Sequence, residues 1–123
     1  LPAFFGVFSA AILLVGYSLK TVDQNRIWHD DLTFWTAAST LSPQKPRVHH
    51  LLGVSLMRFA QPEKAVEAFQ QAIKLSPYYP HPYQGLAYAY RALGKETLAV
   101  EAERQAASVY GVYFKTMTQK QTN

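Results

Sequence analysis

The sequence repeats itself with a period of about 34 residues, and this repeat constrains the fold more than any other feature. The clearest unit runs from Pro46 to Tyr79 and carries Leu52, Gly53, Leu56, Ala65, Phe69, Ala72 and Pro77. The positions one period later hold Leu86, Ala87, Tyr90, Ala99, Glu103, Ala106 and Gly111, and those one period earlier hold Asp31, Trp35, Ala38 and Pro43. A unit this short cannot bury a core alone, so we expect neighbouring units to stack.

Breaks in the sequence divide this region into five predicted helices, at about 31–41, 46–59, 63–75, 81–93 and 96–110. The breaks are rich in proline, serine and glycine. Within 63–75, Ala65, Phe69 and Ala72 share one face, which is typical of an amphipathic helix. We therefore predict an all-α fold of antiparallel helix pairs, a solenoid of about 2.5 repeats.

These positions resemble the tetratricopeptide repeat, whose pattern is aromatic, Leu-Gly, Tyr, Ala, Phe, Ala and Pro. The unit 46–79 matches most of it, whereas the next unit has Ala87 for the glycine and Glu103 for the phenylalanine. The resemblance implies protein binding on the concave side of the solenoid. It assigns to that side Arg47, His50, Val54, Met57, Arg58, His81, Gln84, Tyr88 and Arg91. This basic, aromatic surface suits an acidic or extended peptide or another copy of the chain; the alternative is a set of solvated helix faces.

Residues 1–19 carry no charged side chain, and every charge in the chain falls from Lys20 onward. As a helix this stretch would be about 28 Å long, close to the ~30 Å hydrocarbon core of a bilayer. Three interpretations compete: a membrane span, a helix in the core of a pilin-like homo-oligomer, and a signal peptide. The missing initiator methionine predicts a processed product or a piece of a longer protein.

A wider resemblance covers residues 15–106 and rests on the segment after the apolar stretch. The residues that carry it are Asn25, Arg26, Trp28, Asp30, Leu32, Trp35, Ser42, Pro43, Arg47, His49, Leu52 and Gly53. They resemble the last transmembrane helix and repeat region of polytopic membrane glycosyltransferases of the transmembrane O-mannosyltransferase class. This resemblance implies repeats outside the cytoplasm. The catalytic carboxylates of that class belong to a region absent here, so no catalytic residue carries over.

The residue types exclude several kinds of chemistry. The chain has no cysteine, which excludes disulfides, cysteine-based zinc sites and thiol catalysis. The only clusters that invite a metal or acid–base interpretation are His29-Asp30-Asp31 and His49-His50. We interpret the aspartates as a helix cap and His49 as a packing residue, and predict no metal, cofactor or catalytic site. The net charge of +4 is scattered, so nucleic acid is not a predicted partner.

Both ends of the repeat region carry large apolar side chains. Trp28 and Trp35 are predicted to form a stiff joint between the apolar stretch and the repeats. Gly111 is expected to end the last helix, leaving Val112, Tyr113 and Phe114 in a β-prone tail. Exposed, these three would form a sticky patch that either folds back or docks onto another subunit. The predicted segments are 1–28 (helix and junction), 29–111 (solenoid) and 112–123 (tail).

Two functional hypotheses follow. The first is a non-enzymatic assembly module: residues 1–19 sit in a membrane or an oligomer core, and the solenoid binds protein, other copies included. It would form a homo-oligomer or a pilus-like filament, membrane-anchored or at the cell surface, with the repeats extracytoplasmic. The second is the C-terminal, acceptor-recruiting portion of a membrane glycosyltransferase.

Overall fold

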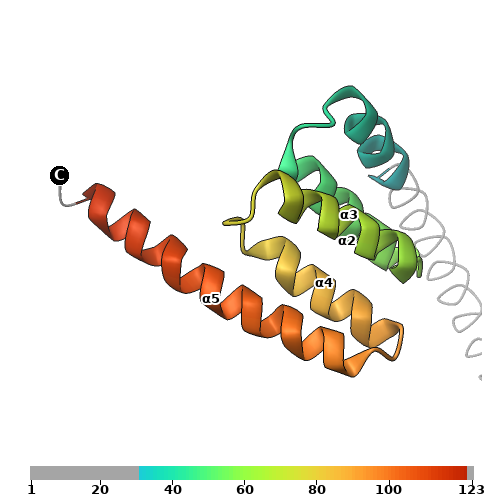
Figure 1. Cartoon of the computed structure of the whole chain (residues 1–123). Coiled ribbons are helices and arrows are strands. Elements are labelled where there is room, and N and C mark those ends of the chain that lie inside the picture. Colours follow the sequence, from blue (N-terminus) through green and yellow to red (C-terminus); the bar gives the residue numbers. More distant parts are fainter. Residues whose placement is uncertain (1–30, 122–123) are drawn as a thin grey trace, which may run out of the picture. The chain divides into compact units, whose positions relative to one another are not determined.

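The computed structural model describes residues 31–121, and every regular element in that range is a helix (Figure 1). Residues 31–41 are helical, and four further helices follow. They are α2 (Pro46–Arg58), α3 (Pro62–Leu75), α4 (His81–Ala92) and α5 (Glu96–Gln121). From Leu32 onward the described residues belong to one compact unit. Each helix from α2 to α5 packs on the next, and α2 also touches α4. The predicted all-α, stacked-hairpin fold is therefore confirmed for this part of the chain.

The helix boundaries follow from proline and from two equivalent tight turns. Pro46 and Pro62 begin α2 and α3, where a missing N–H leaves no hydrogen bond unmade. The hairpin turns close at Ala60 (φ 53°) and Gly94 (φ 73°), which stand at equivalent positions of successive repeat units. In the first turn the N–H of Gln61 donates to Leu56 O at 3.0 Å, in the pattern of a Schellman motif. The repeat in sequence is thus a repeat of backbone conformation.

The core is centred on the ring of Phe69, which is only 1% exposed. This α3 ring fills the space where side chains of α2 and α4 would otherwise stand. A Cβ atom added at Gly53 would lie 2.6 Å from Phe69 Cε1, and one added at Gly85 would lie 2.5 Å from Cε1 and Cζ. Around the ring pack Leu56, Ala65, Ala68, Leu86, Ala87, Ala89 and Ala102. Small residues let three helices approach one aromatic ring closely.

The prediction that the last helix ends at Gly111 is wrong, because α5 continues to Gln121. A glycine inside a helix costs only about 1 kcal/mol relative to alanine, and no proline follows to break the hydrogen-bond ladder. The hydroxyls of Thr116 and Thr118 donate to the carbonyl oxygens four residues before them, at 3.0 and 2.9 Å. Residues 112–118 are therefore helical rather than β-prone and extended.

The second half of α5 extends beyond its partner helix (Figure 1). Helix α4 has 12 residues and α5 has 26, and a short turn joins them. At 1.5 Å per residue, α5 is about 39 Å long and α4 about 18 Å. We call residues 112–121 the overhang.

The predictions for the N-terminal stretch, including the hydrophobic helix at 1–19 and the contact of Trp28 in the joint, lie outside the described residues. Trp35 is half-buried, and its ring meets Phe34 edge to face at 4.9 Å. Within residues 31–121, no helix is both long enough and apolar enough to cross a bilayer.

The packing of Phe69 predicts that methyl groups at the two facing glycines destabilise the fold. Gly53→Ala and Gly85→Ala should each lower the free energy of unfolding by about 1–3 kcal/mol, because the added Cβ overlaps a buried ring. Chemical denaturation followed by circular dichroism measures this difference.

Gly111→Ala is the matched control, because nothing lies within 4 Å of the Cβ it adds. It should leave stability unchanged or raise it by up to about 1 kcal/mol. Combining Phe69→Leu with Gly53→Ala should be less destabilising than the sum of the single changes. Strict additivity, or equal losses at Gly53 and Gly111, would contradict the packing argument.

Candidate functional site

Aromatic rings from α2, α4, α5 and the α3–α4 connection form a continuous row. The ring centroid of His50 lies 5.5 Å from that of Tyr79 and 6.0 Å from that of His81. The centroid of His81 lies 5.4 Å from that of Tyr79 and 6.0 Å from that of Tyr110. Tyr110 stacks on Phe114 at 6.4 Å. We call these five residues the ring row.

A cleft of about 770 Å³ opens beside the ring row. Its walls come from the start of α2, the α3–α4 connection, the start of α4 and the overhang. The lining residues are Pro46, Arg47, His50, Leu51, Ser76, Tyr78, Tyr79, His81 and Tyr113. We call it the ring-lined cleft. Its size falls within the range of clefts that bind small molecules or short peptide segments.

Hydrogen bonds from Tyr110 hold α5 against the start of α4, just before the overhang begins. The hydroxyl of Tyr110 donates to Gln84 Oε1 at 3.2 Å and lies 3.2 Å from His81 Nδ1. The hydroxyl of Tyr83 donates to the carbonyl oxygen of Pro77 at 2.9 Å and so braces the α3–α4 connection. The cleft is therefore built from elements that are tied to one another.

His50 is the most perturbed titratable group in the cleft. Burial lowers its pKa from the ordinary 6.5 to about 4, and the neighbouring charges of His81 and Arg47 act in the same direction. Its Nδ1 atom is buried and has no hydrogen-bond partner among the described residues. Burial also raises the pKa of Tyr79. His50 is thus a neutral imidazole at pH 7.

The residues predicted for the concave side separate into five groups. Arg47, His50 and His81 come together in the ring-lined cleft. Gln84 and Tyr88 line a second hollow of about 350 Å³ between α4 and α5. Val54 and Met57 pack against the core, and Arg58 is exposed at the end of α2. Arg91 is engaged in ion pairs. The predicted surface is therefore not one continuous site.

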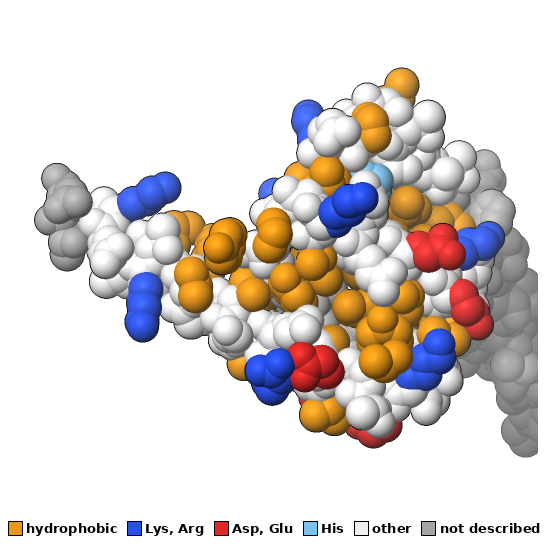
Figure 2. All heavy atoms as spheres, in the orientation of Figure 1, with side chains coloured by type: hydrophobic (Ala, Val, Ile, Leu, Met, Phe, Trp, Pro, Cys, Tyr) orange, Lys and Arg blue, Asp and Glu red, His pale blue; other side chains and the backbone are white. Residues whose placement is uncertain are grey.

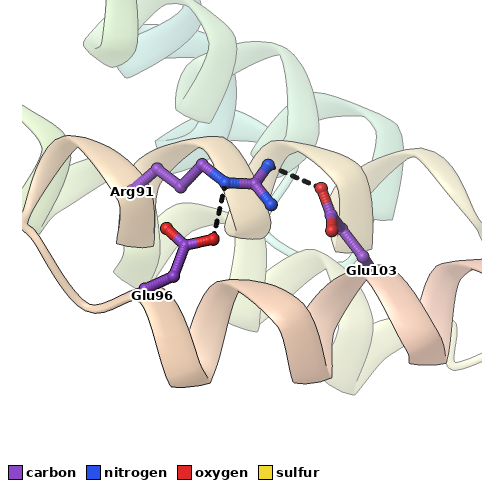
Figure 3. Close-up of polar contacts among 3 residues, drawn as sticks. All are labelled: Arg91, Glu96 and Glu103. Carbon is purple, nitrogen blue, oxygen red and sulfur yellow. Dashed lines mark hydrogen bonds and ion pairs between the residues drawn. The ribbon is translucent and has the colours of Figure 1, made fainter.

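Arg91 holds two carboxylates on the neighbouring helix (Figure 3). Its Nε donates to Glu96 Oε1 at 3.2 Å, and its Nη1 donates to Glu103 Oε1 at 2.5 Å. These hydrogen bonds raise the pKa of Arg91, and Arg91 lowers the pKa of Glu103. One repeat earlier the same three positions hold Met57, Pro62 and Phe69, none of them charged. We call Arg91, Glu96 and Glu103 the charged end cluster.

Three tyrosines of the site were missed from the sequence. Tyr78 and Tyr79 are the last two residues of the repeat unit and stand just before Pro80, in a connection treated only as a helix break. Tyr110 directly precedes Gly111, where the last helix was expected to end. The signal that would have found them is the density of tyrosines between 78 and 113.

The clusters considered for metal or acid–base chemistry do not assemble such a site in the described residues. Across 31–121, no group of three or more His, Asp or Glu side chains lies close enough to hold a metal ion. His49 is half-buried, and its Nε2 donates to the carbonyl oxygen of Pro43 at 2.8 Å. His29 and Asp30 lie outside the described residues.

The low pKa of His50 predicts an acid-sensitive fold. The unfolded chain binds a proton with the ordinary pKa of 6.5 and the folded chain with a pKa of about 4. Stability from the neutral ring is therefore complete above pH 6.5 and is lost as the pH falls toward 4. We expect a loss of about 1–2 kcal/mol, less than the full linkage value because water reaches part of the ring.

Proton NMR of the four histidines measures this titration directly. One imidazole should titrate near pH 4 and disappear from the spectrum of His50→Gln. In denaturation experiments, His50→Gln should lose less stability than the native chain between pH 6.5 and 4. A His50 signal that titrates near 6.5 would contradict the assignment.

Comparison with known proteins places the fold. Residues 46–79 match the tetratricopeptide repeat family. By sequence, the chain has no match among curated proteins. The resemblance of residues 15–106 to membrane glycosyltransferases is tested by neither the repeat match nor the structures below, and it stays a prediction.

Among solved structures, the chain is similar to several of MamA. The structure of MamA MSR-1 has a TM-score of 0.67 and 20% identity, covering 73% of this chain and 52% of that one. MamA 41-end from Desulfovibrio magneticus RS-1 has a TM-score of 0.66 and 22% identity, covering 72% and 50%. The chain thus spans about half the length of these structures. Residues 46–79 match a tetratricopeptide repeat, and the chain shares a helical-repeat fold with MamA.

Proposed function

We propose that this chain is a non-enzymatic protein–protein interaction module that associates with copies of itself through the overhang. The observation that carries this proposal is the exposure of the overhang's apolar side chains. Val112 is 46% exposed, Tyr113 40%, Phe114 64% and Met117 47%. Contiguous apolar surface of this kind is typical of protein interaction sites. Figure 2 shows hydrophobic side chains gathered along this part of α5, with Lys or Arg side chains beside them.

The overhang continues the face by which α5 packs on α4. That face carries Ala99, Ala102 and Ala106, all buried against the helix pair. Tyr113 and Met117 follow on the same face at helical spacing, beyond the N-terminal end of α4 at His81. This face of α5 therefore changes from alanine to large side chains at the point where it passes the start of α4. The change favours a further binding partner at the overhang.

The charged end cluster disfavours the other route to assembly, which is the stacking of repeats end to end. A further hairpin would pack on the face of α5 that carries Glu103, the position equivalent to Phe69. Glu103 is ion-paired with Arg91 and remains half exposed, at 48% of its side chain. A helix stacked on this face would have to desolvate these charges, at an energetic cost that apolar contacts there would not offset.

The proposal includes the apolar stretch and the surroundings of the module. Residues 1–19 hold the chain in a membrane or in an oligomer core, and the repeats lie outside the cytoplasm. The absence of charged side chains from residues 1–19 supports their place in a membrane or oligomer core. The resemblance to membrane glycosyltransferases supports a position of the repeats outside the cytoplasm. If the overhang contacts a different surface of the next copy, the contact repeats without closing and yields a pilus-like filament; a two-fold contact yields a dimer.

Removing apolar side chains from the overhang should weaken self-association. Phe114→Ser with Met117→Ser should lower the association constant of the full 123-residue chain by at least about tenfold, because burial of each such side chain contributes about 1.5–3 kcal/mol. Analytical ultracentrifugation in a mild detergent, over a range of protein concentrations, measures the constant.

Val100→Ser is the matched control, because Val100 is 53% exposed on α5 but lies outside the overhang. It should leave the association constant within about twofold. If Val100→Ser weakens association and the overhang variant does not, assembly proceeds by end-to-end stacking. A chain that is monomeric at every concentration would refute self-association itself.

A further inference from the structure

We propose that the ring-lined cleft binds an extended, acidic segment of a different protein. This inference rests on the proposed function only in that the module binds protein, and it concerns a different surface and a different partner. The cleft is formed by helix starts, by the α3–α4 connection and by the overhang, so its existence depends on the continuation of α5.

The lining of the cleft includes one permanent cation, Arg47, and no carboxylate. Arg47, His50 and His81 line it, and none of its lining residues is Asp or Glu. No residue among those described forms an ion pair with Arg47, which is exposed at the cleft's edge. The overhang adds Lys115 and Lys120, and residues 104–121 contain no acidic side chain. The potential in and around the cleft is therefore positive, which favours a partner that brings negative charge.

The backbone adds to this positive potential. Helices α2 and α4 both begin at the cleft, at Pro46 and His81, and neither has an acidic residue in its first turn. The other two hairpin helices do, with Glu63 in α3 and Glu96 in α5. An acidic side chain at a helix start offsets the positive end of the helix dipole. That compensation is missing only at the two helix starts, among α2 to α5, that line the cleft.

The rings select for an extended chain with apolar side chains between its carboxylates. Neighbouring rings across the cleft lie 5.4–6.0 Å apart, centroid to centroid. Every second side chain of an extended segment is about 6.7 Å from the last on the same side. Tyr78 and Tyr79 supply flat apolar surface for the apolar side chains of such a segment, and hydroxyl groups that can donate hydrogen bonds to its carboxylates.

A second copy of this chain is a poor source of that acidic segment. Three carboxylates of α5 are already engaged: Glu96 and Glu103 with Arg91, and Glu101 with Arg104. The exposed apolar overhang of a second copy is itself basic. The charges therefore favour a different protein for the cleft, even though the overhang serves self-association.

Fluorescence anisotropy with the full chain tests the proposal. The probe is a fluorescein-labelled peptide of about twelve residues in which Glu alternates with Leu and Tyr, and its matched control has Gln for every Glu. The acidic peptide should bind at least about tenfold more tightly than the Gln peptide, and the difference should shrink as salt is raised. Equal binding of the two peptides would overturn the proposal.

Two charge reversals locate the site. Arg47→Glu should weaken binding of the acidic peptide by about tenfold or more. Lys64→Glu makes the same change in net charge at an exposed residue of α3 outside the ring-lined cleft, and it should leave binding within about twofold. Equal effects of the two variants would show non-specific attraction and would overturn the assignment to the cleft.

Two further measurements separate this proposal from its alternatives. A labelled dT12 oligonucleotide should bind more weakly than the acidic peptide; tighter binding would assign the cleft to nucleic acid instead. Met117→Ser alone, which changes the overhang but neither the ring row nor the lining of the cleft, should still bind the peptide. Peptide binding without self-association would refute only the proposed assembly, and self-association without peptide binding would refute only this inference.

Discussion

The contact of one phenylalanine with two glycines is the interaction on which the described fold depends. Phe69 projects from α3 and is received by Gly53 of α2 and Gly85 of α4, neither of which leaves room for a methyl group. A single ring therefore fixes the separation and register of three helices. Because interiors are packed as densely as organic crystals, this contact allows little adjustment. The position of the ring-lined cleft also depends on Phe69, because the His50 ring in its lining lies against Phe69, with ring centroids 5.8 Å apart.

The repeat ends where this contact can no longer form. In the next unit Glu103 takes the place of Phe69 and Ala87 takes that of Gly53. The glutamate is held by Arg91, which stands where the earlier unit has Met57. Exposed ion pairs of this kind contribute little to stability. Their effect is to keep the outer face of α5 polar. This face has no apolar side chain equivalent to Phe69 against which another hairpin could pack, and α5 continues as a single helix.

The sequence predicted local structure well and long-range neighbours poorly. Proline and the repeat placed the starts of α2 to α4 within a residue, because a missing N–H and a left-handed turn act within a few positions of the chain. Gly111 misled the same reasoning: nothing near it in space forces a turn, and the helix runs through it. The concave face was inferred from a family pattern. That pattern does not show that Arg91 forms an ion pair with Glu103 or that Val54 packs against the core. Tyr79 and Tyr110 belong to the site only because folding brings α2, α4 and α5 together.

The overhang links the two proposed binding surfaces through one helix. Tyr110 anchors α5 to His81 and Gln84, Tyr113 forms a wall of the ring-lined cleft, and Phe114 faces solvent four residues after Tyr110. A segment bound in the cleft would contact Tyr113, next to the exposed Phe114 at which a second copy is proposed to bind. The two binding events are therefore expected to be coupled, and by thermodynamic reciprocity each would change the affinity of the other by the same factor.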